Sequence, residues 1–82
     1  MSYTAIVDYG VGNLKSVANA LSYIGQESRI CDDARGLELA DAIILPGVGA
    51  FPDAAERLRQ SGLETVLKKQ AEQKPILGIC LG

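Results

Sequence analysis

Residues 42–49 read AIILPGVG, an apolar run that ends in a proline and a glycine-rich turn. Four consecutive apolar residues predict a buried strand over Ala42–Leu45, and the proline–glycine pair that follows predicts where the strand stops. Pro52 and Asp53 then open a helix, because proline suits the first helical position and an acidic side chain stabilises the first turn. The stretch therefore predicts a strand, a turn and a helix in succession.

The same kinds of element are predicted on both sides of this stretch. Thr4–Val7 is an apolar run before a glycine loop, and residues 14–24 carry an apolar stripe at helical spacing. Pro75–Ile79 reads as another buried strand. Glu27–Cys31 is more polar, which suits a strand at a sheet edge, and residues 32–40 form a polar connection with room for one helical turn.

Apolar strands that alternate with helices predict a parallel sheet covered on both faces, an α/β fold. The expected strand order is 2-1-3-4, that of a flavodoxin-like three-layer fold. Gly62 ends or bends the helix that begins at Pro52, and an apolar stripe resumes after it. Strands 2 and 4 would lie roughly 14 Å apart, too far for a disulfide. Cys31 and Cys80 are therefore both expected to be free thiols.

Composition excludes several classes of function. The 82 residues have a net charge of −2 and no basic run, which argues against nucleic acid or an anionic membrane as a partner. No apolar run approaches the roughly 18 residues of a membrane span. The N-terminus lacks the features of a signal peptide, so we expect a cytoplasmic protein. The chain has no histidine and no metal-ligand spacing, so neither a metal nor another cofactor is expected.

Three glycine-bearing turns follow three of the predicted strands: GVGN at 10–13, PGVG at 46–49 and GICLG at 78–82. The carboxyl ends of parallel strands lie on one rim of a sheet, and open α/β sheets bind ligands there. The three turns are therefore expected to meet at one place. This convergence is more informative than any one of the motifs alone.

GICLG has the form G-x-C-x-G, the cysteine version of the G-x-S-x-G nucleophile elbow. Its two glycines relieve crowding around a residue on a tight strand-to-helix turn. The pattern favours Cys80 as a nucleophile, with the N–H of Leu81 directed at a developing oxyanion. Taken without its glycines, Cys80 would read as a small buried residue at a strand end.

The other two turns carry weaker signals. The N–H groups of Gly47, Val48 and Gly49 are able to face a substrate, although an ordinary strand-to-helix turn explains them equally well. GVGN does not complete a dinucleotide fingerprint, because Lys15 occupies the position of the last glycine. Asn13 is most simply a helix N-cap, while the nearby aspartate, at position 8, either caps the loop or touches a partner.

Together, IVDYGVGNLKSVANAL, ADAIILPGVGAFPDA and KPILGICLG resemble the N-terminal part of the glutamine amidotransferase subunits of imidazole glycerol phosphate synthases, a class I, triad-type family of histidine biosynthesis. The resemblance covers essentially the whole chain. Family members are more than twice this length. The resemblance therefore implies that residues 1–82 are the N-terminal part of a single amidotransferase domain, ending at the nucleophile elbow.

The resemblance implies a role for each motif. Cys80 would attack the side-chain amide of glutamine to form a glutamyl thioester and release ammonia. The N–H groups of residues 47–49 and of Leu81 would hold the oxyanion. Asn13 would face a (β/α)8-barrel cyclase subunit, into which ammonia passes to make imidazole glycerol phosphate.

The family's catalytic His and Glu lie downstream of the cysteine, and this chain has no histidine. Without a positioned base, the 82 residues alone are expected to be inactive as a glutaminase. Two alternatives stay open: another cysteine-elbow member of the class I superfamily, and a non-catalytic half-fold with an inert Cys80. The apolar last strand, if left as an open edge, is also expected to drive self-association.

Overall fold

The computed structural model describes residues 2–10, 14–46 and 52–79, with the backbone alone for 52–55 and 79. Its elements follow the predicted order, with an added short helix: β1 (Thr4–Val7), α1 (Leu14–Tyr23), β2 (Ser28–Cys31), α2 (Ala34–Leu39), β3 (Ala42–Pro46), α3 (Pro52–Ser61), α4 (Leu63–Ala71) and β4 (Ile76–Ile79). These strands form one parallel sheet in the order β2-β1-β3-β4. The predicted α/β class and strand order are confirmed.

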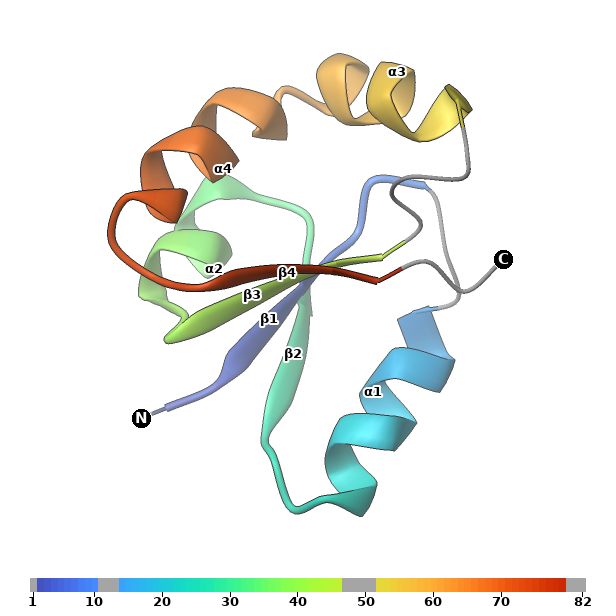
Figure 1. Ribbon diagram of the computed structural model, residues 1–82, viewed down its shortest axis with the longest axis vertical. Coiled ribbons are helices and arrows are strands. Elements are labelled where there is room, and N and C mark those ends of the chain that lie inside the picture. The colour runs from blue at the N-terminus through green and yellow to red at the C-terminus, as the bar shows by residue number, and fades with distance from the viewer. Residues whose placement is uncertain (1, 11–13, 47–51, 80–82) are drawn as a thin grey trace.

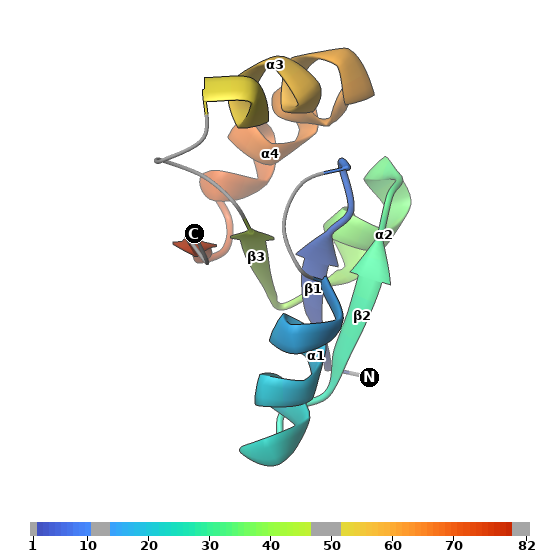
Figure 2. The same cartoon turned by 90° about the vertical axis from the view of Figure 1, so that its right-hand side faces the viewer.

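The helices cover both faces of the sheet. Figure 1 shows α1 on one side and α2, α3 and α4 on the other, and Figure 2 shows the same separation after a quarter turn. From β1 the chain moves outward to β2, and it then crosses back to β3 and on to β4. Right-handed crossovers in these two opposite directions place their helices on opposite faces. The result is the three-layer arrangement of a flavodoxin-like domain.

Strand β1 is buried on both faces, so its side chains, which point alternately to either face, pack into two separate cores. Ala5, Val7 and Tyr9 belong to the larger cluster, with side chains from α2 and α4. Ile6 points the other way and packs in the smaller cluster with Ile44 of β3 and Val17 of α1. A fully apolar strand in the middle of the sheet follows directly from covering both faces with helices.

Glycine ends α1 as its position in the sequence predicts. Gly25 has φ of +80° and is the first residue past the helix cap. The N–H of Gly25 donates to the carbonyl of Ser22 at 3.0 Å, and the N–H of Gln26 donates to the carbonyl of Leu21 at 2.8 Å. This pair of bonds is a Schellman motif, which satisfies the last carbonyls of the helix.

The structure settles two points that the sequence left open. Gly62, with φ of +80°, ends α3 and starts a separate helix, because a left-handed residue breaks the hydrogen-bond ladder. The polar connection at 32–40 holds α2, whose N-cap Asp33 accepts a 2.9 Å hydrogen bond from the N–H of Gly36. The short crossover from β2 to β3 is therefore made by a helix of six residues.

Candidate active site

The register of the sheet sets the geometry of the rim. Strands β3 and β4 are paired so that Pro46 lies opposite Ile79. The next residue along β3 begins the Gly-Val-Gly stretch, and the next along β4 is the elbow cysteine. Strand β1 lies on the other side of β3, and its carboxyl end reaches the same rim (Figure 1). The three strands that precede the glycine turns are therefore neighbours, as the strand order predicted.

The site residues predicted from the sequence lie outside the described residues. Their roles stay predictions, resting on the strands that lead to them. They are Asn13, Gly47, Val48, Gly49, Cys80 and Leu81.

Tyr9, to which the sequence gave no function, contacts the last residue before the Gly-Val-Gly stretch. Its side chain is buried, with 6% of its surface exposed, and its hydroxyl donates a hydrogen bond to the carbonyl oxygen of Pro46. Burial raises the pKa of the Tyr9 phenol above its ordinary value of 10.0, so the group is a protonated donor at neutral pH. From the sequence, only the alternation of side chains that begins in β1 indicates that Tyr9 points toward the core. No motif in the sequence indicates a contact between Tyr9 and Pro46.

Next to Tyr9, Gly10 has φ of +88°, a conformation that side chains other than glycine rarely adopt. A Cβ at this position would lie 3.2 Å from Nη1 of Arg57, whose side chain extends from α3. The sequence placed Arg57 on a solvated helix face, and its side chain is indeed exposed. The structure adds that its guanidinium lies beside the turn that follows β1.

Cys31 is a free, buried thiol at the end of β2. Burial first, and the nearby charge of Asp33 second, raise the pKa of this thiol above its ordinary value of 9.0. Its Sγ lies 3.7 Å from the carbonyl oxygen of Arg29. A protonated, buried thiol is a poor nucleophile. The prediction that Cys31 is a free thiol in a structural position is confirmed.

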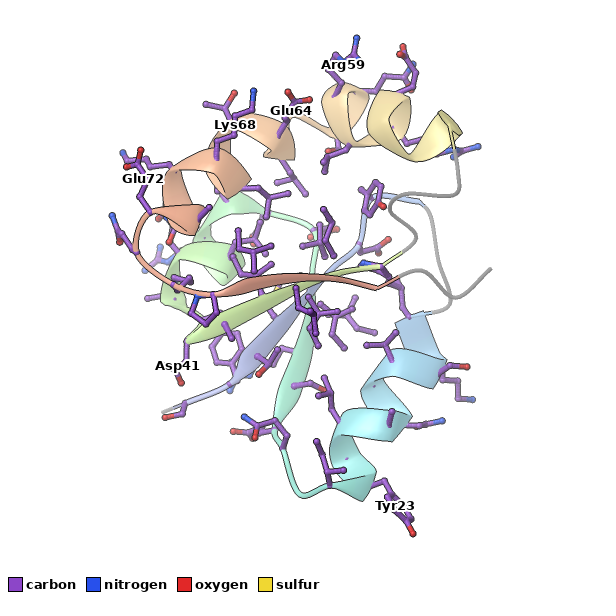
Figure 3. All side chains as sticks on the ribbon, in the orientation of Figure 1. Tyr23, Asp41, Arg59, Glu64, Lys68 and Glu72 are labelled. Atoms are coloured by element: carbon purple, nitrogen blue, oxygen red, sulfur yellow. The ribbon has the colours of Figure 1, made fainter. Side chains whose placement is uncertain are left out.

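An apolar groove of about 470 Å³ opens beside β4, away from the described rim residues. Leu45, Leu67 and Ile76 line it between the sheet and the helices α3 and α4. Its outer side carries the exposed ion pair between Lys68 and Glu64, at 3.2 Å, which Figure 3 shows on the solvent side of α4. The groove lies beside a strand that is unpaired within the described residues, and its lining combines apolar side chains with the charged Arg59, Glu64 and Lys68.

The described parts of the chain contain no group of three or more His, Cys, Asp or Glu residues placed to hold a metal ion. Among the helices described, none has the length and apolar character needed to cross a membrane.

The family model for class-I glutamine amidotransferases matches residues 5–82. This chain belongs to the class-I glutamine amidotransferase family. Several relatives carry the name imidazole glycerol phosphate synthase subunit HisH. That of Oceanobacillus iheyensis is 52% identical over 79 residues, which are 95% of this chain and 39% of the relative. That of Caldanaerobacter subterraneus is 51% identical over 78 residues, 94% of this chain and 38% of the relative.

A third relative of that name, from Bacillus cereus, is 52% identical over 79 residues, 95% of this chain and 38% of the relative. This amidotransferase chain thus spans about two fifths of the length of the curated relatives that it matches. About half of the residues are identical over nearly the whole chain, so the HisH subunits are close relatives of this chain within the family.

Proposed function

We propose that this chain supplies the nucleophile and part of the oxyanion site of a glutaminase. The observation that supports the proposal most directly is the pairing of Pro46 with Ile79 in a family member. Since the two residues are opposite one another, the Gly-Val-Gly stretch and Cys80 leave adjacent strands at the same level. A nucleophile and its oxyanion donors need this proximity, because both must reach one carbonyl group.

In the proposed reaction, the Cys80 thiolate attacks the amide carbon of glutamine, and the carbonyl oxygen becomes an oxyanion. The N–H groups of residues 47–49 and of Leu81 hold that charge. The tetrahedral intermediate then collapses, the C–N bond breaks, and the amine leaves as ammonia after gaining a proton. Water hydrolyses the resulting thioester to glutamate and restores the thiol.

The base that activates the thiol lies outside these 82 residues, since they contain no histidine. The 82 residues are thus proposed to be the N-terminal part of one amidotransferase domain and to be inactive alone. In the whole enzyme, the ammonia passes to a (β/α)8-barrel cyclase subunit bound through the rim near Asn13. The pair forms a cytoplasmic heterodimer that makes imidazole glycerol phosphate for histidine biosynthesis, with hydrolase and lyase half-reactions.

The test uses a chimera in which residues 1–82 replace the matching part of the Oceanobacillus iheyensis subunit, assayed with the other subunit of that synthase. Glutamate release is expected from the chimera and not from the 82-residue chain. Cys80→Ala should lower the rate by a factor on the order of 10⁴ or more. Cys31→Ala is the matched control, because that thiol is buried at the far edge strand. An active Cys80→Ala chimera would contradict the proposal.

We also propose that the 82-residue chain alone self-associates through β4. On the side away from β3, this strand is unpaired within the described residues. Leu77 exposes 59% of its surface on the α1 face, and Ile76 lines the apolar groove on the other face. A second copy would cover both faces and pair the free edge.

A further inference from the structure

The hydrogen bond between Tyr9 and Pro46 joins the ends of two strands at the candidate site. The two residues are 37 positions apart in the sequence, and the bond is buried. Pro46 is among the most deeply buried residues of the chain and is the last residue of β3. Its carbonyl oxygen is therefore shielded from water, and the Tyr9 hydroxyl provides the hydrogen bond that water does not.

The position of this bond gives it a consequence beyond stability. A peptide unit is planar, so a carbonyl that is held in one direction also fixes the orientation of the N–H across the same peptide bond. The peptide bond in question joins Pro46 to Gly47, the first residue of the stretch proposed to bind the oxyanion. Oxyanion donors lose much of their effect when they are displaced from the charge they stabilise.

We propose that Tyr9 is a positioning residue for the oxyanion site: by holding the Pro46 carbonyl, it sets the plane of the Pro46–Gly47 peptide. This inference rests on the proposed glutaminase function. Tyr9 acts through the backbone and does not contact glutamine. Its ring packs in the larger core cluster, which restricts the position of the hydroxyl.

The surroundings of Tyr9 suit this role. Tyr9 lies two residues past the end of β1, and its ring packs with side chains from α2 and α4 just before the chain turns at Gly10. Strand β1 ends at Val7, and Gly10, with its positive φ, follows Tyr9 with the Arg57 side chain beside it. A tyrosine hydroxyl is a protonated donor at neutral pH, and burial moves the pKa of this phenol still higher.

The chain contains a close structural match that serves as a control. Tyr3 directly precedes β1, whereas Tyr9 follows it; Tyr3 is also 6% exposed and belongs to the same cluster. Its hydroxyl donates to a backbone carbonyl as well, that of Gly36 in α2, at 2.6 Å. Tyr3 is at the opposite end of β1 from the candidate site. If a buried tyrosine bond matters only for stability, Tyr3→Phe and Tyr9→Phe should behave alike.

The first measurement is catalytic and uses the full-length chimera with its partner subunit. Tyr9→Phe keeps the ring and removes only the donor. We expect kcat for glutamate release to fall about 10- to 100-fold with KM nearly unchanged, the pattern of a loss confined to the transition state. Tyr3→Phe should change kcat by less than about 2-fold. Equal kcat values for the two variants, at equal folded fractions, would overturn the proposal.

The second measurement reads the peptide directly and does not depend on activity. Pro46–Gly47 is the only proline–glycine pair in the sequence. In the 82-residue chain, labelling proline with ¹³C at the carbonyl and glycine with ¹⁵N therefore gives a single carbonyl–amide NMR correlation, which comes from this peptide. Tyr9→Phe should move the Pro46 carbonyl resonance upfield, as for a carbonyl that loses a hydrogen bond, and Tyr3→Phe should leave it in place. An unmoved resonance in Tyr9→Phe would refute the inference.

The two proposals fail in different ways. A Cys80→Ala chimera that keeps its activity would refute the glutaminase proposal, while the NMR shift would still decide whether Tyr9 holds the peptide. A chimera that depends on Cys80 but is indifferent to Tyr9→Phe would refute the positioning role alone.

Discussion

Lys74 connects the turn before β4 to the end of α2, and its replacement should cost far more stability than that of a neighbouring lysine. Its Nζ donates to the carbonyls of Leu37 and Glu38 at 3.0 Å and 2.8 Å. These carbonyls lie in the last turn of α2, where the helix dipole favours a cation. The carbonyl of Leu37 also accepts a long 3.4 Å hydrogen bond from the N–H of Ala40. One lysine thus donates hydrogen bonds to two carbonyls of a helix that lies 36 or more residues earlier in the sequence.

The expected loss for Lys74→Met can be estimated from these contacts. Hydrogen bonds to charged groups contribute about 1.5–3 kcal/mol each, and the bond to Glu38 lies near the low end because it is exposed. Allowing for solvation of the carbonyls in the variant, we expect a loss of about 2 kcal/mol in the free energy of unfolding. For a domain of this size, that corresponds to a fall in Tm of roughly 8–16 °C.

The assay is urea unfolding followed by circular dichroism, at a protein concentration low enough to keep the chain monomeric. Lys68→Met is the matched control, because Lys68 contacts the exposed Glu64 and such helix pairs contribute at most about 0.5 kcal/mol. Both variants remove one positive charge and keep most of the aliphatic stem. Equal losses for Lys74→Met and Lys68→Met would refute the estimate.

Three further outcomes are expected. The free energy of unfolding should stay level from neutral pH to about pH 8 and fall at higher pH, because the folded state raises the pKa of three acids and so holds their protons more tightly than the unfolded chain. The three are Tyr3, Tyr9 and Cys31. A urea midpoint that stays flat up to about pH 11 would contradict this. Gly36→Ala should cost about 1–3 kcal/mol, since its Cβ would lie 2.8 Å from Sγ of Cys31, and adding Cys31→Ala should recover part of the loss in the same unfolding assay. Leu77→Lys should reduce self-association of the 82-residue chain in sedimentation, whereas Ile30→Lys, 50% exposed on the opposite edge strand, should not.

The sequence was sufficient for the architecture because local patterns determine it. Apolar runs without polar interruptions identify strands covered on both faces, and the handedness of crossovers leaves few possible strand orders. Gly25 and Gly62 mark helix ends because a left-handed residue has few alternatives to glycine. The strand ends differ from prediction by one residue at β2, β3 and β4, which is the usual uncertainty of a boundary.

The contacts that position the site could not be predicted in this way. The bond from Tyr9 to Pro46 and the bonds from Lys74 to α2 join residues that only the folded chain brings together. Their residue types give no signal, because a tyrosine or a lysine near a strand end is compatible with many environments. Arg57 is another case: its helix face reads as solvated, yet its side chain lies beside Gly10. Sequence motifs predict which residues react, whereas tertiary hydrogen bonds decide how the backbone around them is held.

In the proposed function, Cys80 forms a covalent bond to glutamine beside the Gly-Val-Gly stretch. The most direct test is to mix the chimera and its partner subunit with glutamine, quench with acid during turnover, and analyse the peptide that contains Cys80 by mass spectrometry. We expect a glutamyl adduct on that peptide, absent in Cys80→Ala and unchanged in Cys31→Ala. Turnover of glutamine without an adduct on Cys80, or with the adduct on another residue, would contradict it.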